Sequence, residues 1–189
     1  LWRRRQPLSE TGAEAEQTFQ AVVKARPPMI ARRILMWRPI ILCAAMLIGF
    51  AAAAFVQQAA LPSVVNGAVA ASPFVAMCGW IWAIFQVSSC GLPGTASGLQ
   101  KWIFAAPPAI VFVAVTAGWS LSNSTSAVVF FISLFVAVWL SASALEQAHD
   151  RGGKPSVGGT LSTALMMYFA PLGVWGLRAK VLQVALRSP

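Results

Sequence analysis

The chain alternates between long apolar runs and short polar or basic segments. No Asp, Glu, Lys or Arg occurs from Pro39 to Gln100, or from Trp102 to Leu145. A helix of about 20 apolar residues spans the roughly 30 Å of hydrocarbon in a bilayer. Uncharged stretches of this length would aggregate if they faced water. The pattern therefore predicts an all-α, polytopic helical membrane protein.

Prolines and polar residues divide the apolar runs into four predicted transmembrane helices, over 39–60, 68–90, 102–121 and 126–145. Pro39 suits the first position of the first helix, where its missing N–H costs nothing. In the third, Pro107 and Pro108 indicate either a helix that begins near Pro107 or a kink. The apolar segment 161–177 is short and contains Pro171, so we expect it to be re-entrant or tilted, with a fifth span as the alternative. The tail 178–187 has the pattern of an interfacial amphipathic helix.

These elements divide the chain into four parts: a basic N-terminal extension (1–38), a four-helix transmembrane bundle (39–145), a polar loop (146–159) and a C-terminal hydrophobic and amphipathic segment (160–189). Within the extension, Thr11 and Glu14 have the spacing of a capping box, and two prolines follow at 27 and 28. We therefore expect a short amphipathic helix over 11–26. A mostly solvated tail is the alternative.

Small residues recur at every fourth position on three of the predicted spans. This spacing places them on one helix face, where small side chains allow a second helix to approach closely. The predicted helix-packing residues are Ala45, Gly49, Ala53, Ala68, Ser72, Ala76, Ser133, Ala137 and Ser141.

The charge distribution predicts the orientation in the membrane. The chain carries 14 Lys and Arg against 5 Asp and Glu, a net charge of +9. With four spans, every basic residue lies on one side, so both termini are expected on the cytoplasmic, stromal or matrix side. Anionic headgroups or acidic neighbouring subunits, rather than nucleic acid, are the expected partners of this charge. The predicted membrane-interface residues are Arg32, Arg33, Trp37, Arg38, Lys101, Trp102, Trp119, Arg178 and Lys180.

Few residues carry candidate chemistry. The single histidine, His149, excludes bis-histidine haem and zinc sites built on several histidines. Glu146, His149 and Asp150 form the one place where acid and imidazole gather. A solvated helix end with ordinary ion pairs is the preferred interpretation, and a metal or proton-transfer site is the alternative. We predict no catalytic residue and no metal site.

The remaining polar groups favour packing roles. The three cysteines form no CxxC pair, and a helix would separate Cys78 from Cys90 by about 18 Å, too far for a disulfide. Uncharged side chains in or near the spans are expected to hydrogen-bond between helices, with coordination of a chlorophyll magnesium as the alternative: Gln57, Gln58, Asn66, Gln86 and Gln100. No cofactor is assigned. Trp80 and Trp82, deep in the second span, are expected to be lipid-facing or core residues. Contact with a bound lipid, a pigment or a partner helix is the alternative for these two.

These features favour a non-catalytic accessory or structural subunit of a larger membrane complex, with other integral membrane subunits as partners. The chain begins with Leu1 and a basic stretch, which a cleaved targeting peptide or a fragment of a longer chain would each explain. The first explanation favours an imported organellar protein and hence an energy-transducing, photosynthetic or respiratory membrane. The alternative is a small homo-oligomeric transporter or channel for a neutral solute or lipid. An intramembrane enzyme acting through Glu146, His149 and Asp150 is a third hypothesis.

Overall fold

The computed structural model describes residues 29–36, 38–56, 62–90, 100–119, 124–150 and 156–187. All regular structure in these ranges is helical, which confirms the predicted all-α class. The helix predicted over 11–26 lies outside the described residues. The eight helices within these ranges are α2 (Met29–Met36), α3 (Pro39–Val56), α4 (Ser63–Ser89), α5 (Gln100–Thr116), α6 (Ser124–His149), α7 (Val157–Tyr168), α8 (Ala170–Gly176) and α9 (Arg178–Arg187).

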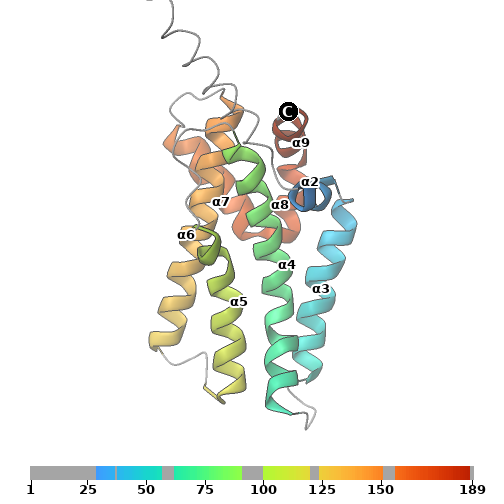
Figure 1. Ribbon diagram of the computed structural model, residues 1–189, viewed down its shortest axis with the longest axis vertical. Helices are drawn as coiled ribbons and strands as arrows, with labels where there is room; N and C mark the ends of the chain where they lie inside the picture. Colours follow the sequence, from blue (N-terminus) through green and yellow to red (C-terminus); the bar gives the residue numbers. More distant parts are fainter. Residues whose placement is uncertain are drawn as a thin grey trace, which may run out of the picture.

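Helices α3 to α6 run along the long axis of the molecule (Figure 1). Helix α4 lies at the centre and packs against α3, α5 and α6. Its second half lies in the core, with Trp80, Ile81 and Ile84 almost fully enclosed. The end of α3 and the start of α4 lie at the lower end of the view, as do the end of α5 and the start of α6, whereas α6 and α9 end at the upper end.

Two of these helices are long and apolar enough to cross a membrane, α4 and the Thr125–His149 part of α6. Helices α2 and α3 meet at 92° and count as a third candidate when they are taken as one broken span. Helix α5 is a shorter apolar helix, with Trp102–Thr116 as its apolar part. By length and composition the structure therefore has two to three candidate spans, fewer than the four predicted from the sequence.

Helix α5 is shorter than the predicted 102–121 span because a glycine ends it. Gly118 has a φ of 68°, its N–H donates to the Val115 carbonyl, and the Trp119 N–H donates to the Ala114 carbonyl. These bonds form a Schellman cap, which needs a left-handed residue that only glycine adopts without penalty. At its other end, α5 begins before Pro107 and Pro108 and continues through both.

A proline inside α4 allows a close contact with α3. A Cβ on Gly49 would lie 3.0 Å from the Pro73 nitrogen, so the two backbones nearly touch. Proline has no N–H for the carbonyl of Val69, four residues earlier. The hydroxyl of Ser72 donates to that carbonyl at 2.8 Å. A side chain therefore replaces the missing backbone bond, as membrane helices require.

The C-terminal helices form a hairpin against the upper half of the bundle (Figure 1). Helix α7 packs on α6, α8 on α3, and α9 on α6, α4 and α2. The thiol of Cys43 donates to the Pro171 carbonyl at 3.0 Å and ties α3 to α8. The turn at Phe169 brings α8 onto α7, where a Cβ on Gly173 would lie 1.8 Å from the Met166 carbonyl oxygen. Only a residue without a side chain fits there.

Candidate functional site

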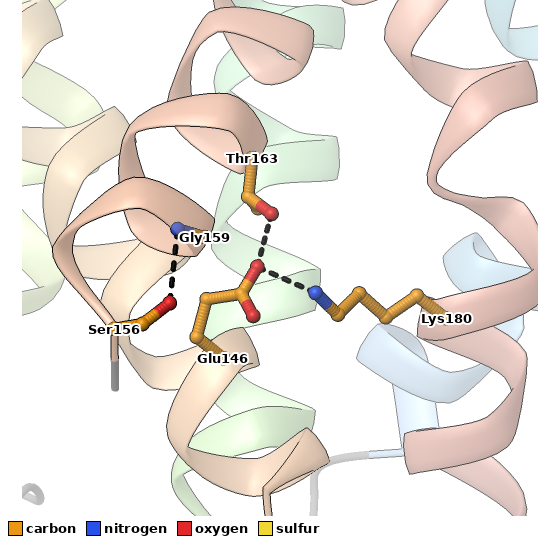
Figure 2. A network of polar contacts seen from close by, with 5 residues as sticks. All are labelled: Glu146, Ser156, Gly159, Thr163 and Lys180. Carbon is orange, nitrogen blue, oxygen red and sulfur yellow. Dashed lines mark hydrogen bonds and ion pairs between the residues drawn. The ribbon is translucent and has the colours of Figure 1, made fainter. Parts of the chain in front are cut away.

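The last turns of α6 carry the most buried acidic side chain in the described part of the chain. The Glu146 side chain is 6% exposed. Its Oε1 accepts hydrogen bonds from the hydroxyl of Thr163 in α7 and, at 2.5 Å, from the ammonium of Lys180 in α9 (Figure 2). We call Glu146, Thr163 and Lys180 the Glu146 cluster. It joins three helices at one carboxylate.

This cluster changes the boundary of the segment predicted as a polar loop over 146–159. Helix α6 continues to His149 and buries Glu146. Lys180, predicted to lie at the membrane interface, has a side chain that is 24% exposed and pairs with Glu146. A carboxylate inside the protein requires a neutralising partner, and α9 supplies it.

The first turn of α7 lies close to the Glu146 carboxylate. Ser156 caps the helix, and its hydroxyl accepts from the Gly159 N–H at 3.1 Å. A Cβ on Gly159 would lie 3.3 Å from Oε2 of Glu146, so a side chain there would crowd the acid. The amino end of a helix also carries partial positive charge, which stabilises a nearby carboxylate. Thr160 and Thr163 are each only 3% exposed on the same helix.

The side chains of His149 and Asp150 make no hydrogen bond to the Glu146 carboxylate. The Nδ1 atom of His149 is buried and has no hydrogen-bond partner among the described residues. Asp150 is exposed at the end of α6. Among the described residues, no three His, Cys, Asp or Glu side chains are placed to hold one metal ion. In this arrangement Glu146 is an ion-pair partner that holds helices together.

The predicted packing residues differ in where they lie. Ala137 and Ser141 are fully buried, and the Ser141 hydroxyl donates to the Ile81 carbonyl of α4 at 3.2 Å. Gly49 is buried against Pro73. Three more are half-buried: Ala53, Ala76 and Ser133. The last three are exposed: Ala45, Ala68 and Ser72.

On α4, the small residues that pack within the chain are one position removed from the predicted stripe. Gly67 and Ala71 are buried, whereas Ala68 and Ser72 face outward. A Cβ on Gly67 would lie 2.2 Å from the Thr116 hydroxyl and 2.9 Å from the Phe112 carbonyl. Gly67 therefore sets the close approach of α4 to α5, a contact that the predicted stripe missed.

The other predicted interface residues lie mostly at the surface. Trp102 and Trp119 are 74% and 61% exposed. Arg32 is half-buried, and its guanidinium lies 3.5 Å from the Ala185 carbonyl of α9. Exposed side chains are found at Arg33, Arg38 and Arg178. Trp37 and the side chain of Lys101 lie outside the described residues.

The amide side chains give no support to a pigment site. Gln57, Gln58 and the side chain of Gln100 lie outside the description. Asn66 and Gln86 are half-buried, and neither faces the groove described below. At the end of α4, the Cys90 thiol donates to the Gln86 carbonyl at 3.0 Å. Cys43, Cys78 and Cys90 are all free, as expected.

A second feature is an open groove between α4 and α5. Its volume is about 380 Å³. The groove is lined by Val75, Cys78, Gly79 and Trp82 of α4 and by Phe104, Ala105 and Pro108 of α5. Comparisons with protein-family models, with curated proteins and with solved structures find no match to this chain.

Proposed function

We propose that this chain is a non-catalytic integral membrane subunit of a larger membrane complex. It crosses the membrane four times, with both termini on the basic side. An energy-transducing membrane is its proposed setting, which rests on the sequence pattern alone. The four proposed crossings exceed the two to three candidate spans that helix length and hydropathy support.

The Glu146 cluster is the observation that carries the proposal. Glu146 is the acidic side chain that an enzyme or an ion-coupled transporter would use, since ionisable groups within spans usually serve function. Here one carboxylate oxygen accepts from both Thr163 and Lys180. The charge is neutralised inside the protein and fixes α7 and α9 on α6. Its role is structural, which supports a subunit that contributes surface rather than chemistry.

The outer surface supports a partner within the membrane. Ala45 and Ala68 belong to the predicted packing stripes but are exposed within the single chain. Exposed small residues on a span leave room for a helix of another subunit to approach. The exposed face of α6 adds a broad apolar surface around Phe131 and Phe135.

Helix lengths and chain direction support four crossings. Helices α3 and α5 contain 18 and 17 residues, about 27 Å and 26 Å at 1.5 Å per residue. These lengths approach the hydrocarbon thickness, and tilt or local thinning accommodates the difference. Thr163 and Lys180 contact the same oxygen of Glu146, so the chain between them leaves that level of α6 and returns to it. This path is that of a re-entrant hairpin rather than a fifth span.

Native electrophoresis after extraction in mild detergent tests the proposal. We expect the chain to migrate within a large band that contains other membrane subunits, which mass spectrometry will identify. The double variant Ala45→Leu/Ala68→Leu should release the chain from this band while its own unfolding temperature stays unchanged. Ala54→Leu is the matched control, because Ala54 is also exposed on α3 but lies about half a turn away from Ala45.

Migration of the wild-type chain alone would overturn the proposal. A band of a few identical copies would instead favour the second candidate function, a small transporter or channel for a neutral solute or lipid. The open groove between α4 and α5 supports that candidate. Assays of solute and lipid movement in vesicles would then follow.

A further inference from the structure

Helix α2 lies across the upper end of α3 rather than in line with it (Figure 1). The axes of the two helices meet at 92°. Because α3 is a proposed span, a helix at a right angle to it lies in the plane of the membrane. The eight residues of α2 extend over about 12 Å, at 1.5 Å per residue. Helix α2 therefore covers the membrane surface and adds no length to the span.

One arginine fixes how α2 is turned about its own axis. The guanidinium of Arg32 donates to the carbonyl of Ala185 at 3.5 Å, in the last turn of α9. Helix α9 ends above α2 in the view of Figure 1, on the side away from the body of α3. At about 100° per residue, Ile30 and Ile34 lie on the flank of α2 opposite Arg32. These two isoleucines are therefore directed toward the hydrocarbon that surrounds α3.

Arg33 has a different environment from Arg32. Ala31 and Leu35 are the buried residues of α2, and Arg33 lies on the opposite, outward face, where its side chain is exposed. Two large apolar side chains are exposed at the ends of this face, Met29 by 81% and Met36 by 68%. A cation between apolar side chains suits the boundary of headgroups and acyl chains, because both kinds of group find partners there.

Two further arginines lie where α2 joins α3. Arg38 is exposed directly before Pro39, the first residue of α3. Arg178, the first residue of α9, is also exposed, and it lines a small hollow together with Pro39. The start of α9 therefore adds a third positive charge to this end of α3. We call Arg33, Arg38 and Arg178 the basic corner.

The charge of the basic corner is not balanced by the helices that carry it. Helices α2, α3, α8 and α9 contain no Asp or Glu. Glu146 in α6 is paired with Lys180 and leaves no charge to offer. Each Lys or Arg close to an anionic membrane surface strengthens binding by about fivefold. An anionic phospholipid matches this surface in both respects, because its phosphate pairs with arginine and its acyl chains cover the exposed apolar side chains.

We propose that α2 is an interfacial helix and that the basic corner binds the phosphate groups of anionic phospholipids. Arg32 is the tether that orients α2, and Arg33 contacts the headgroups. The inference rests on the proposed crossing by α3, but not on membership of a complex. The purified chain is therefore used in both tests, so that a failure to bind lipid is distinguished from a failure to assemble with other subunits.

Native mass spectrometry of the purified full chain measures the lipid preference. The chain in detergent is titrated with phosphatidylglycerol and, in a parallel sample, with phosphatidylcholine that carries the same acyl chains. We expect phosphatidylglycerol to bind more tightly, by about fivefold or more. Arg33→Gln should weaken phosphatidylglycerol binding by about fivefold, whereas Arg33→Lys should retain most of it because the charge is kept.

Arg32→Gln is the matched control, because it removes the same charge one residue earlier. This variant should lower the unfolding temperature, since the bond to Ala185 is lost, and should retain the preference for phosphatidylglycerol. Arg33→Gln should leave the unfolding temperature unchanged. Equal losses of phosphatidylglycerol binding in the two variants would overturn the proposal. Equal binding of the two lipids by the wild-type chain would also overturn it, and would assign the basic corner to an acidic segment of a partner protein.

Fluorescence quenching tests the orientation of α2 independently. Cysteine replaces Ile30 or Arg33 in a chain from which the three native cysteines have been removed, and carries a bimane label in phosphatidylcholine vesicles. A nitroxide on the acyl chain should quench the label more strongly in Ile30→Cys. A nitroxide on the headgroup should quench it more strongly in Arg33→Cys. The same order of quenching in both variants, or no quenching in either, would show that α2 does not lie in the interface as proposed.

Discussion

At the scale of the residue, Lys180 is the partner on which the buried Glu146 carboxylate depends. Removal of one member of a buried ion pair leaves the other charge unpaired in a poorly solvated position. We expect Lys180→Met to lower the free energy of unfolding by about 2 to 3 kcal/mol. This loss is smaller than the loss for a fully buried ion pair, because the Lys180 side chain is 24% exposed. The double variant Glu146→Gln/Lys180→Met should recover part of this loss.

Arg178→Met is the control, because it removes an exposed charge two residues earlier and should change stability little. Unfolding in detergent micelles compares the three variants with the wild type, and equal losses for Lys180→Met and Arg178→Met would contradict the assignment.

Ser72 offers a second test at the same scale. Its hydroxyl donates to the Val69 carbonyl, for which Pro73 has no N–H. Ser133 in α6 donates to the Phe130 carbonyl at the same distance of 2.8 Å, but that carbonyl also has the usual backbone N–H four residues later. We therefore expect Ser72→Ala to cost about 1 kcal/mol more than Ser133→Ala. Thermal unfolding in the same detergent compares the two, and a similar cost for both would show that Ser72 has no special role.

At the scale of the element, the hairpin of α7 and α8 depends on one glycine. A Cβ on Gly173 would lie 1.8 Å from the Met166 carbonyl oxygen, which forces the helices apart. The corresponding Cβ on Gly176 would approach only the flexible Met166 sulfur, at 3.2 Å. We expect Gly173→Ala to destabilise by about 3 kcal/mol, and Gly176→Ala by well under 1 kcal/mol.

Cys43 reports on the same change, because its thiol donates to the Pro171 carbonyl of α8. In a background where Cys43 is the sole cysteine, its maleimide labelling should accelerate in Gly173→Ala and not in Gly176→Ala. Slow labelling in both variants would mean that the hairpin tolerates a side chain at position 173.

The sequence predicted the elements better than their contacts. The segment 161–177 with Pro171 was expected to lack one continuous spanning helix, and it contains the break between α7 and α8. The pairing of Glu146 with Lys180 could not be predicted, since 34 residues and two turns separate them. The packing face of α4 could not be predicted from the sequence either, because alanines and other small residues occur on several faces of this helix. Only the contact with Thr116 and Phe112 selects Gly67 over Ala68.

At the scale of the whole molecule, the path of the C-terminal helices decides the orientation of the chain. Asp150 is exposed at the end of α6, just before the hairpin formed by α7 to α9. Gln183 is exposed in α9, within that hairpin, and Ser63 is exposed at the start of α4. Each is replaced by cysteine in turn, in a background of Cys43→Ser, Cys78→Ala and Cys90→Ala. A membrane-impermeant maleimide applied to sealed vesicles should label Asp150→Cys and Gln183→Cys from one side and Ser63→Cys from the other. A permeant maleimide labels all three and serves as the control.

A fifth crossing gives a different pattern, because it would carry Gln183 to the side of Ser63. The contact of Glu146 with both Thr163 and Lys180 argues against this, since the chain must return to the level of α6 from which it departed. The charges agree, because a fifth crossing would place Arg178, Lys180 and Arg187 opposite the other basic residues, against the positive-inside rule. Joint labelling of Asp150→Cys and Gln183→Cys would therefore establish the re-entrant hairpin, and joint labelling of Gln183→Cys and Ser63→Cys would replace it with a fifth span.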